Sequence, residues 1–161
     1  MIIVGIDPGA DGAIVALDGD RASAWRMPTQ DQRGRRRLDA RAIVAILRPR
    51  HEGGVRVVVE APSVRPGEGA QGALGVGLMH GGIRGVLDAL GVPWRDVHPQ
   101  TWRAGVGLPK EQDRKQRKHD AILLCERLLP GLELVYPGCR KPHDGTADAA
   151  LMAVWGRSQA W

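Results

Sequence analysis

Residues 1–9, MIIVGIDPG, open the chain with a β-branched apolar run that stops at an acid and a turn. The run predicts a strand over residues 2–6, and the PGADG segment after it predicts a tight turn. Two further apolar segments, residues 13–17 and 22–27, follow after short connections. We therefore predict that the chain begins with an antiparallel meander of three strands.

The rest of the chain alternates between strand and helix patterns. A β-branched run at residues 55–59 predicts a strand buried on both faces, and it ends at Glu60. A short strand is expected over residues 92–97. Helices are expected over residues 39–48, 66–90, 111–129 and 146–155, with a turn or short helix at 99–101, a polar, Arg-dense stretch at 31–37 and a Pro/Gly loop at 130–142. We therefore expect an α/β fold with a mixed β-sheet (antiparallel meander, then parallel strands) flanked by helices, and residues 1–161 as a single domain.

Composition excludes several classes of protein. The chain has 161 residues, of which 25% are charged and 43% hydrophobic, the balance of a soluble globular domain. Two cysteines cannot build a disulfide framework, no apolar run reaches the roughly 20 residues of a membrane span, and the N-terminus lacks a basic signal region. We therefore expect a cytoplasmic protein. Its net charge of +5 favours a polyanionic partner, with nucleic acid as the first candidate.

Four acids stand at the ends of predicted elements. Asp7 closes the first strand and Glu60 the buried one, while Asp144 and Asp148 lie one helical turn apart at the start of the last helix. Clustered carboxylates repel one another unless cations lie between them, and Mg²⁺ or Mn²⁺ takes such oxygen ligands. Two ions about 3.5–4 Å apart would suit phosphodiester hydrolysis. The alternative is that Asp7 and Glu60 are an ordinary turn residue and a solvated strand end.

Basic side chains gather in two stretches, residues 33–37 and 110–118. In the second, four side chains at spacings of three and four would share one helix face and form a track for phosphates. The alternative for both stretches is a solvated surface. The candidate DNA-binding residues are Arg35, Arg36, Lys110, Arg114, Arg117 and Lys118. Trp102 is interpreted as a core residue in preference to a base-stacking one.

Two glycine patterns have competing interpretations. Gly77, Gly81 and Gly85 recur at every fourth residue, a spacing that lets helices approach closely, either against the chain's own sheet, which we favour slightly, or against a partner subunit. Residues 67–72 match G-x-G-x-x-G but start several residues after the strand, so a dinucleotide site is not expected there. A flexible loop that meets DNA is the better interpretation, and no nucleotide cofactor is expected.

Four blocks of sequence resemble a known family. They are GIDPGADGAIVAL (5–17), VVVEAPS (57–63), HPQTWRAGVGLPKEQ (98–112) and HDGTADAALMAVWG (143–156). Their order and spacing are similar to the phage-type branch of the RuvC family of Holliday junction resolvases, with the D-P-G turn and the A-D-A-A-L helix as the specific parts. The resemblance implies an RNase H-like fold, a homodimer and Mg²⁺-dependent cleavage of four-way DNA junctions. It also implies metal-binding acids at Asp7, Glu60 and Asp148, and a role for Lys110 near the scissile phosphate.

The sequence departs from this family at one position. The family usually has its last two metal-side residues three apart, and Gly145 stands three before Asp148. Either Asp144 or His143 must then take that role. Because Mg²⁺ prefers oxygen to nitrogen, we favour Asp144, which could also cap the helix; His143 is the rival, as a metal ligand or an orienter of water.

The leading hypothesis is therefore a structure-selective DNA endonuclease. It would resolve four-way junctions as a homodimer making paired nicks, with two Mg²⁺ ions per active site, replaceable by Mn²⁺. The alternatives are an RNase H-like nuclease acting on ribosomal RNA precursors and a nucleic-acid-binding module without catalysis. A sugar-kinase-like ATPase needs two duplicated domains, for which the chain is too short.

Overall fold

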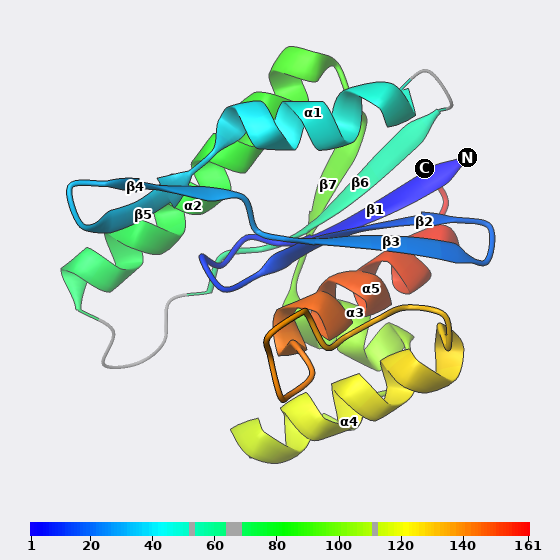
Figure 1. Ribbon diagram of the computed structural model, residues 1–161. Coiled ribbons are helices and arrows are strands. Elements are labelled where there is room, and N and C mark those ends of the chain that lie inside the picture. The colour runs from blue at the N-terminus through cyan, green and yellow to red at the C-terminus, as the bar shows by residue number, and fades with distance from the viewer. Residues whose placement is uncertain (52–53, 64–68, 111–112) are drawn as a thin grey trace.

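A mixed sheet organises the molecule (Figure 1). The computed structural model describes residues 1–51, 54–63, 69–110 and 113–161. Its five-stranded sheet has the order β3-β2-β1-β6-β7. The strands are β1 (Ile2–Asp7), β2 (Ala13–Asp18), β3 (Arg21–Arg26), β6 (Val55–Glu60) and β7 (Trp94–Val97). The first three form the predicted antiparallel meander, and β6 and β7 run parallel to β1.

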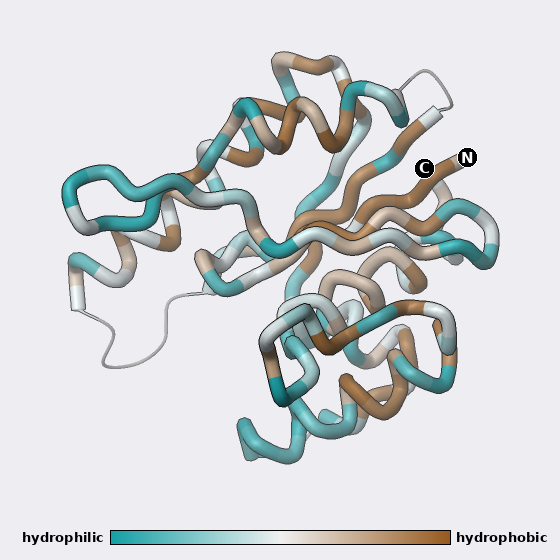
Figure 2. Tube along the Cα trace, in the orientation of Figure 1, coloured by the Kyte–Doolittle hydropathy of each residue, from teal (hydrophilic) through white to brown (hydrophobic). Residues whose placement is uncertain are grey.

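Helices cover both faces of this sheet. α1 (Ala40–His51) and α2 (Ala70–Leu90) lie on one side, and α3 (Pro99–Gly105), α4 (Arg114–Leu128) and α5 (Asp144–Arg157) lie on the other (Figure 1). Alternating strand residues supply the two cores: Ile3 and Val58 face α3–α5, whereas Val4 and Val57 face α1 and α2. Figure 2 shows the hydrophobic residues concentrated along the central strands β1 and β6. The predicted fold class, an α/β fold with a mixed sheet flanked by helices, is confirmed.

Gly5 allows α5 to lie directly on β1. A Cβ at Gly5 would stand 1.9 Å from the carbonyl oxygen of Ala149 and 2.9 Å from the nitrogen of Ala153. No side chain fits between backbones at that distance. The start of α5 is therefore held close to the carboxyl end of β1.

The Arg-dense stretch is a β-hairpin, which sequence analysis did not predict. β4 (Thr29–Gln32) pairs antiparallel with β5 (Arg35–Leu38) in a separate two-stranded sheet. Arg33 and Gly34 form its turn with φ of 58° and 75°, and Asp31 Oδ1 accepts a hydrogen bond from the Gly34 N–H. Both turn residues have positive φ, as two-residue hairpin loops of type I′ require. The polar sequence lacks the apolar alternation by which a strand is normally predicted.

Several predicted helix bounds are corrected. Pro49 lies inside α1, in its last turn, instead of ending the helix at residue 48: its missing N–H removes one helix hydrogen bond, and only two residues of the helix follow it. α4 begins at Arg114, because the Asp113 side chain accepts from the N–H groups of Lys115 and Gln116. Lys110 therefore precedes the helix instead of sharing its face, and residues 111–112 lie outside the described ranges.

The α2 prediction is confirmed at its C-terminal end. Gly91 has φ of 64° and caps the helix as expected. The predicted start at residues 66–68 lies outside the described residues. The loop expected at 67–72 is wrong over its described part, because residues 70–72 form the first turn of α2 and Gly69 is its N-cap. Gly77, Gly81 and Gly85 face open space, so the interpretation that they pack against the sheet is wrong.

None of the helices within the described ranges combines the length and apolarity needed to cross a membrane. The two cysteines are free, with Cys125 buried in the core and Cys139 exposed.

Candidate active site at the carboxyl ends of β1 and β6

Two of the predicted acids end neighbouring parallel strands. Ile6 pairs with Val59, so Asp7 and Glu60 follow at the same level of the sheet. The carboxyl ends of parallel strands are where α/β folds commonly place their sites. The turn after β1 holds Asp7, because the Gly9 N–H donates to its Oδ1 at 3.2 Å.

The other two acids come from the start of α5. Asp144 is the first residue of the helix, and Asp148 follows one turn later. Gly145, between them, lies against the β1–β2 turn: a Cβ there would stand 3.0 Å from Asp7 Oδ2 and 2.8 Å from the Asp11 carbonyl oxygen. A larger residue at 145 would thus push the helix away from Asp7. The glycine that departs from the family pattern is therefore part of how α5 approaches the strand ends.

The acids affect one another electrostatically. Burial, and after it the charges of Asp7 and Asp148, raise the pKa of Glu60 to about 7, against the opposing hydrogen bond of Trp102. Burial also raises the pKa of Asp148 to about 7, against the opposing charge of Arg103 and with the support of Asp7 and Asp144. Burial is the main reason that the pKa of Asp7 is raised as well, and the charge of Asp144 adds to it. The pKa values of these three carboxyls are therefore raised first by burial and second by the negative charges that share one site.

Two cations neutralise the acids of α5. Arg103 Nη2 donates to both carboxylate oxygens of Asp148 at 2.9 Å. Lys118 Nζ forms an ion pair with Asp144 Oδ2. Burial acts to raise the pKa of Asp144, but the hydrogen bond and charge of Lys118 outweigh it, so that this pKa lies below its usual value. Each α5 acid thus has its own basic partner, contributed by α3 or α4.

Sequence analysis missed Arg103. The residue lies on a seven-residue helix, within the block 98–112 that resembles the family, but it was not among the candidate site residues. Its position follows from Trp102, which is fully buried, as predicted for a core residue, and whose Nε1 donates to Glu60 Oε2 at 2.9 Å. The Trp-Arg pair therefore contacts two acids with adjacent side chains. A tryptophan followed by a basic residue was the available signal, and only the tertiary contact explains it.

His143 is the N-cap of α5, so the prediction that Asp144 could cap this helix is wrong. Its Nδ1 accepts from the Thr146 N–H at 3.0 Å and lies 2.9 Å from Thr146 Oγ1. The ring meets Tyr136 edge-on, with 5.4 Å between centroids. Burial, and then the charge of Arg26, lowers the pKa of His143, which favours the neutral imidazole. Because Nδ1 is occupied by the cap, Nε2 is the nitrogen that remains for other contacts.

The structure distributes the predicted basic residues around the acids. Lys118 contacts Asp144, whereas Arg114 and Arg117 are exposed on α4 and Lys110 is exposed just before it. On the hairpin, Arg35 is exposed. Arg36 pairs with Asp11 at 2.8 Å and donates to the Ala10 carbonyl at 3.2 Å. The DNA-binding candidates thus lie on both sides of the β1–β2 turn.

The donor set suits a divalent cation. Carboxylate oxygens are the ligands of Mg²⁺ and Mn²⁺, and a bound cation would relieve the repulsion that raises the pKa values of the buried acids. As the side chains stand, no three acidic, histidine or cysteine groups among the described residues converge on one point. Two of the four acids are instead paired with bases, Asp148 with Arg103 and Asp144 with Lys118.

Comparison with solved structures identifies the fold. RuvC of Thermus thermophilus in complex with a Holliday junction substrate is 18% identical, with a TM-score of 0.56, and the match covers 96% of this chain and 92% of that one. A second Thermus thermophilus RuvC structure is 18% identical, with a TM-score of 0.54 and coverage of 98% and 95%. No protein-family model and no curated protein matches the sequence. The chain therefore has the RNase H-like α/β fold of the RuvC structures over nearly its whole length.

Proposed function

We propose that this chain is a structure-selective DNA endonuclease that resolves four-way (Holliday) junctions. Within this proposal, residues 1–161 form one nuclease domain of the phage-type branch of the RuvC family and work in the cytoplasm. The observation that carries the proposal is the group of four carboxylates at the carboxyl ends of β1 and β6, three of them with raised pKa values, in a RuvC fold. A binding scaffold would not need to bury mutually repelling acids.

Asp7, Glu60, Asp144 and Asp148 would hold two Mg²⁺ ions, for which Mn²⁺ could substitute. When bound, such ions polarise the scissile phosphate and lower the pKa of the attacking water. Trp102 orients Glu60 through its indole N–H, and Gly9 orients Asp7. Arg103 and Lys118 neutralise the acids of α5 in the absence of metal ions and become available to phosphate oxygens once cations take their place.

The remaining polar groups would act on the substrate. Lys110 offsets charge on the scissile phosphate, and His143, neutral through its lowered pKa, orients water with Nε2. Arg35 and Arg36 on one side, and Arg114, Arg117 and Lys118 on the other, would hold DNA phosphates across the acids. Affinity for a junction should then fall steeply with salt concentration.

The second half of the proposal is a homodimer formed through α2. Leu74 and Leu78 are 54% and 47% exposed, and Gly77, Gly81 and Gly85 beside them project no side chain. At helical spacing these residues form one stripe, the α2 stripe, on which a second copy of the helix could pack closely. Two copies would supply the two active sites that paired nicks need.

The test compares Asp7→Asn with Asp18→Asn, an exposed acid at the far end of β2. Labelled four-way junction, linear duplex and RNA–DNA hybrid are each incubated with Mg²⁺, Mn²⁺, Ca²⁺ or chelator. We expect the wild type and Asp18→Asn to cut only the junction, and only with Mg²⁺ or Mn²⁺, whereas Asp7→Asn binds the junction without cutting it. Ca²⁺ should support binding alone.

Other outcomes contradict the proposal in different ways. Full activity in chelator, or cutting by Asp7→Asn, would remove the metal-binding role of the acids. Preferred cutting of the hybrid would indicate the RNA-directed alternative. If the wild type binds the junction without cutting it, the result would support the alternative of a nucleic-acid-binding module without catalysis.

A further inference from the structure

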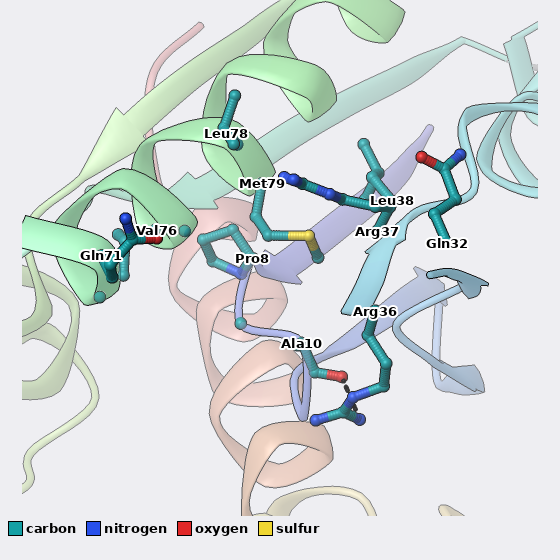
Figure 3. Close-up of a pocket in the computed structure, with 13 residues that line it drawn as sticks. Pro8, Ala10, Gln32, Arg36, Arg37, Leu38, Gln71, Val76, Leu78 and Met79 are labelled. Carbon is teal, nitrogen blue, oxygen red and sulfur yellow. Dashed lines mark hydrogen bonds between the residues drawn. The ribbon is translucent and has the colours of Figure 1, made fainter. Parts of the chain in front are cut away.

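The β1–β2 turn has different surroundings on its two sides. On the side of α2, Arg36 donates to the Ala10 carbonyl and borders a cleft of about 600 Å³ that none of the four acids lines (Figure 3). On the other side the turn meets the start of α5. There, three polar side chains contact one another and form the hydroxyl network: Tyr136, Thr146 and His143. The proposed function uses only the last of them.

Thr146 lies between the other two members of the hydroxyl network. Its Oγ1 is 2.9 Å from the Tyr136 hydroxyl oxygen and 2.9 Å from His143 Nδ1. Its backbone N–H donates to the same Nδ1 at 3.0 Å. Thr146 is fully buried, and Tyr136, the only tyrosine of the chain, is half-buried. The Thr146 hydroxyl is therefore shielded from bulk water and exchanges its hydrogen bonds with these neighbours.

The backbone N–H of Thr146 fixes the direction of every hydrogen bond in the network. An N–H group can only donate, so His143 Nδ1 accepts with its lone pair and carries no proton. The Thr146 hydroxyl can then only donate to Nδ1. Its single proton is used there, so the Tyr136 hydroxyl must donate to Thr146 Oγ1. A neutral imidazole has one ring proton, which therefore resides on Nε2 of His143.

Further contacts hold the imidazole ring in place. The His143 N–H donates to the Leu134 carbonyl at 2.8 Å, and the Tyr136 ring meets the imidazole edge-on. The Arg26 guanidinium lies 4.6 Å from the centroid of the Tyr136 ring and fixes it from β3. The orientation of His143 thus depends on a tyrosine of the loop before α5, which sequence analysis did not single out.

We propose that Tyr136 and Thr146 are positioning residues that hold His143 in the tautomer with its proton on Nε2. In this tautomer His143 donates a hydrogen bond to water or to a phosphate oxygen at the acids. It cannot bind a metal ion, because Nε2 has no free lone pair and Nδ1 is used by the helix cap. The inference rests on the proposed function and deepens it, since it leaves Asp144 as the residue that fills the fourth metal-side position.

The first experiment observes the ring proton and needs neither metal nor DNA. The full chain, labelled with nitrogen-15 in its histidines, is studied by NMR at a pH well above the ordinary pKa of histidine. The signals of His143 are identified by their loss in His143→Asn, which keeps a capping side chain. We expect the shift of a protonated nitrogen for Nε2 and that of an unprotonated one for Nδ1, with the same pattern after Mg²⁺ is added.

Two NMR results would contradict the assignment. The first is a protonated Nδ1, which is the tautomer that a metal-binding Nε2 requires. The second is an Nε2 signal that moves into the range of an unprotonated nitrogen when Mg²⁺ is added.

Hydroxyl variants test the two positioning residues. Tyr136→Phe keeps the ring contact and removes the donor, and Thr146→Val removes the central hydroxyl at similar volume. Each should lower the population of the Nε2–H tautomer, so that the two ring-nitrogen signals shift toward each other. Each should also slow single-turnover cutting several-fold at unchanged junction affinity. Thr146→Ser, which retains the hydroxyl, should restore the wild-type signals, and thermal melts check that all three variants are folded.

Wild-type nitrogen shifts in both Tyr136→Phe and Thr146→Val would remove the positioning role of these residues. Unequal results are also informative: a shift in Thr146→Val alone would restrict that role to Thr146 and contradict the part given to Tyr136.

Metal binding is measured separately by calorimetry with Mn²⁺ alone, in the absence of DNA. His143→Asn should keep the wild-type affinity within about twofold, whereas Asp144→Asn should weaken it by about tenfold or more. The two variants remove neighbouring side chains and are therefore matched. A loss of affinity in His143→Asn that equals or exceeds the loss in Asp144→Asn would make His143 the ligand and overturn the inference.

The two proposals fail separately. If junctions are cut, yet Nδ1 carries the proton or His143→Asn loses its affinity for Mn²⁺, the nuclease stands and the donor role of His143 is wrong. If no junction is cut while the proton resides on Nε2 and responds to the hydroxyl variants, the nuclease is wrong and the positioning of His143 by the hydroxyl network stands.

Discussion

α5 and α2 are both rich in small and apolar residues, yet they differ in how much of each helix is buried. Ten of the 14 residues of α5 are buried, against five of the 21 of α2. α5 lies between the sheet and α4, and it carries two of the acids. α2 has one face on the sheet and, on the other, the α2 stripe with two exposed leucines.

The difference shows that apolar composition alone does not determine burial within one chain. A helix that is apolar all round is normally enclosed, and α5 meets that expectation inside the protomer. α2 meets it only if a second protomer covers its stripe. Glycine follows the same division: Gly5 admits α5 to the sheet, whereas the glycines of the stripe face open space.

The largest effect is expected at the start of α5. Asp144→Ala should abolish junction cutting and keep junction binding, because Mg²⁺ would lose a carboxylate ligand. His143→Ala should only slow cutting, although loss of the helix cap should cost about 1 kcal/mol of stability. Single-turnover cleavage, gel-shift binding and thermal melts measure the three quantities. Reversed phenotypes would assign the fourth metal-side position to His143 and contradict the role we give to this end of α5.

The two classes of glycine should respond with opposite sign. Gly5→Ala should lower the free energy of unfolding by about 3 kcal/mol, because the Cβ meets backbone atoms that cannot yield. Gly75→Ala, in open space on α2, should raise it by about 1 kcal/mol through helix propensity. Denaturant titration of both variants checks this. Equal tolerance at the two positions would mean that α5 does not lie as close to β1 as the structure has it.

The exposed face of α2 should control the oligomeric state. Leu78→Asp should convert a dimer into a monomer at micromolar concentration, because it places a charge inside the proposed helix–helix contact. Leu123→Asp is the matched control, since Leu123 is 50% exposed on α4 and lies outside the stripe. Light scattering gives the masses. If the wild type is a monomer and still cuts junctions, or if Leu78→Asp leaves the mass unchanged, the proposed dimer interface on α2 is contradicted.

The smallest effect concerns pH. Glu60 and Asp148, with pKa values of about 7, keep protons in the folded state that an unfolded chain releases near pH 4. Because the native state binds more protons, the stability of the metal-free protein should fall as the pH rises from about 4 to 7. The affinity for Mn²⁺ should rise over the same interval, by up to about tenfold per pH unit for each proton released. Thermal melts and calorimetry in buffers of different ionisation enthalpy test this, and Asp148→Asn should weaken both trends.

Sequence analysis predicted the elements whose signals are local. The meander, the buried strand ending at Glu60 and the Gly91 cap follow from runs and turns that a few residues define. Asp7 and Glu60 were predicted each at the end of a strand, and the parallel pairing of β1 with β6 brings these two ends to the same level. The hairpin of β4 and β5 was not predicted, because its strands are polar on both faces. Its turn is recognised in the structure by the positive φ of Arg33 and Gly34.

Sequence by itself therefore determined the strands of the main sheet, the helices between them and the acids at their ends, because periodicity, turn chemistry and capping act over a few residues. Only the tertiary structure decided which charges meet: Arg103 with Asp148, Lys118 with Asp144, and Gly145 against Asp7. These contacts join residues that lie far apart in the chain, and their strength depends on burial. The same holds for the uncovered stripe of α2, since exposure belongs to the packed molecule and not to any segment of its sequence.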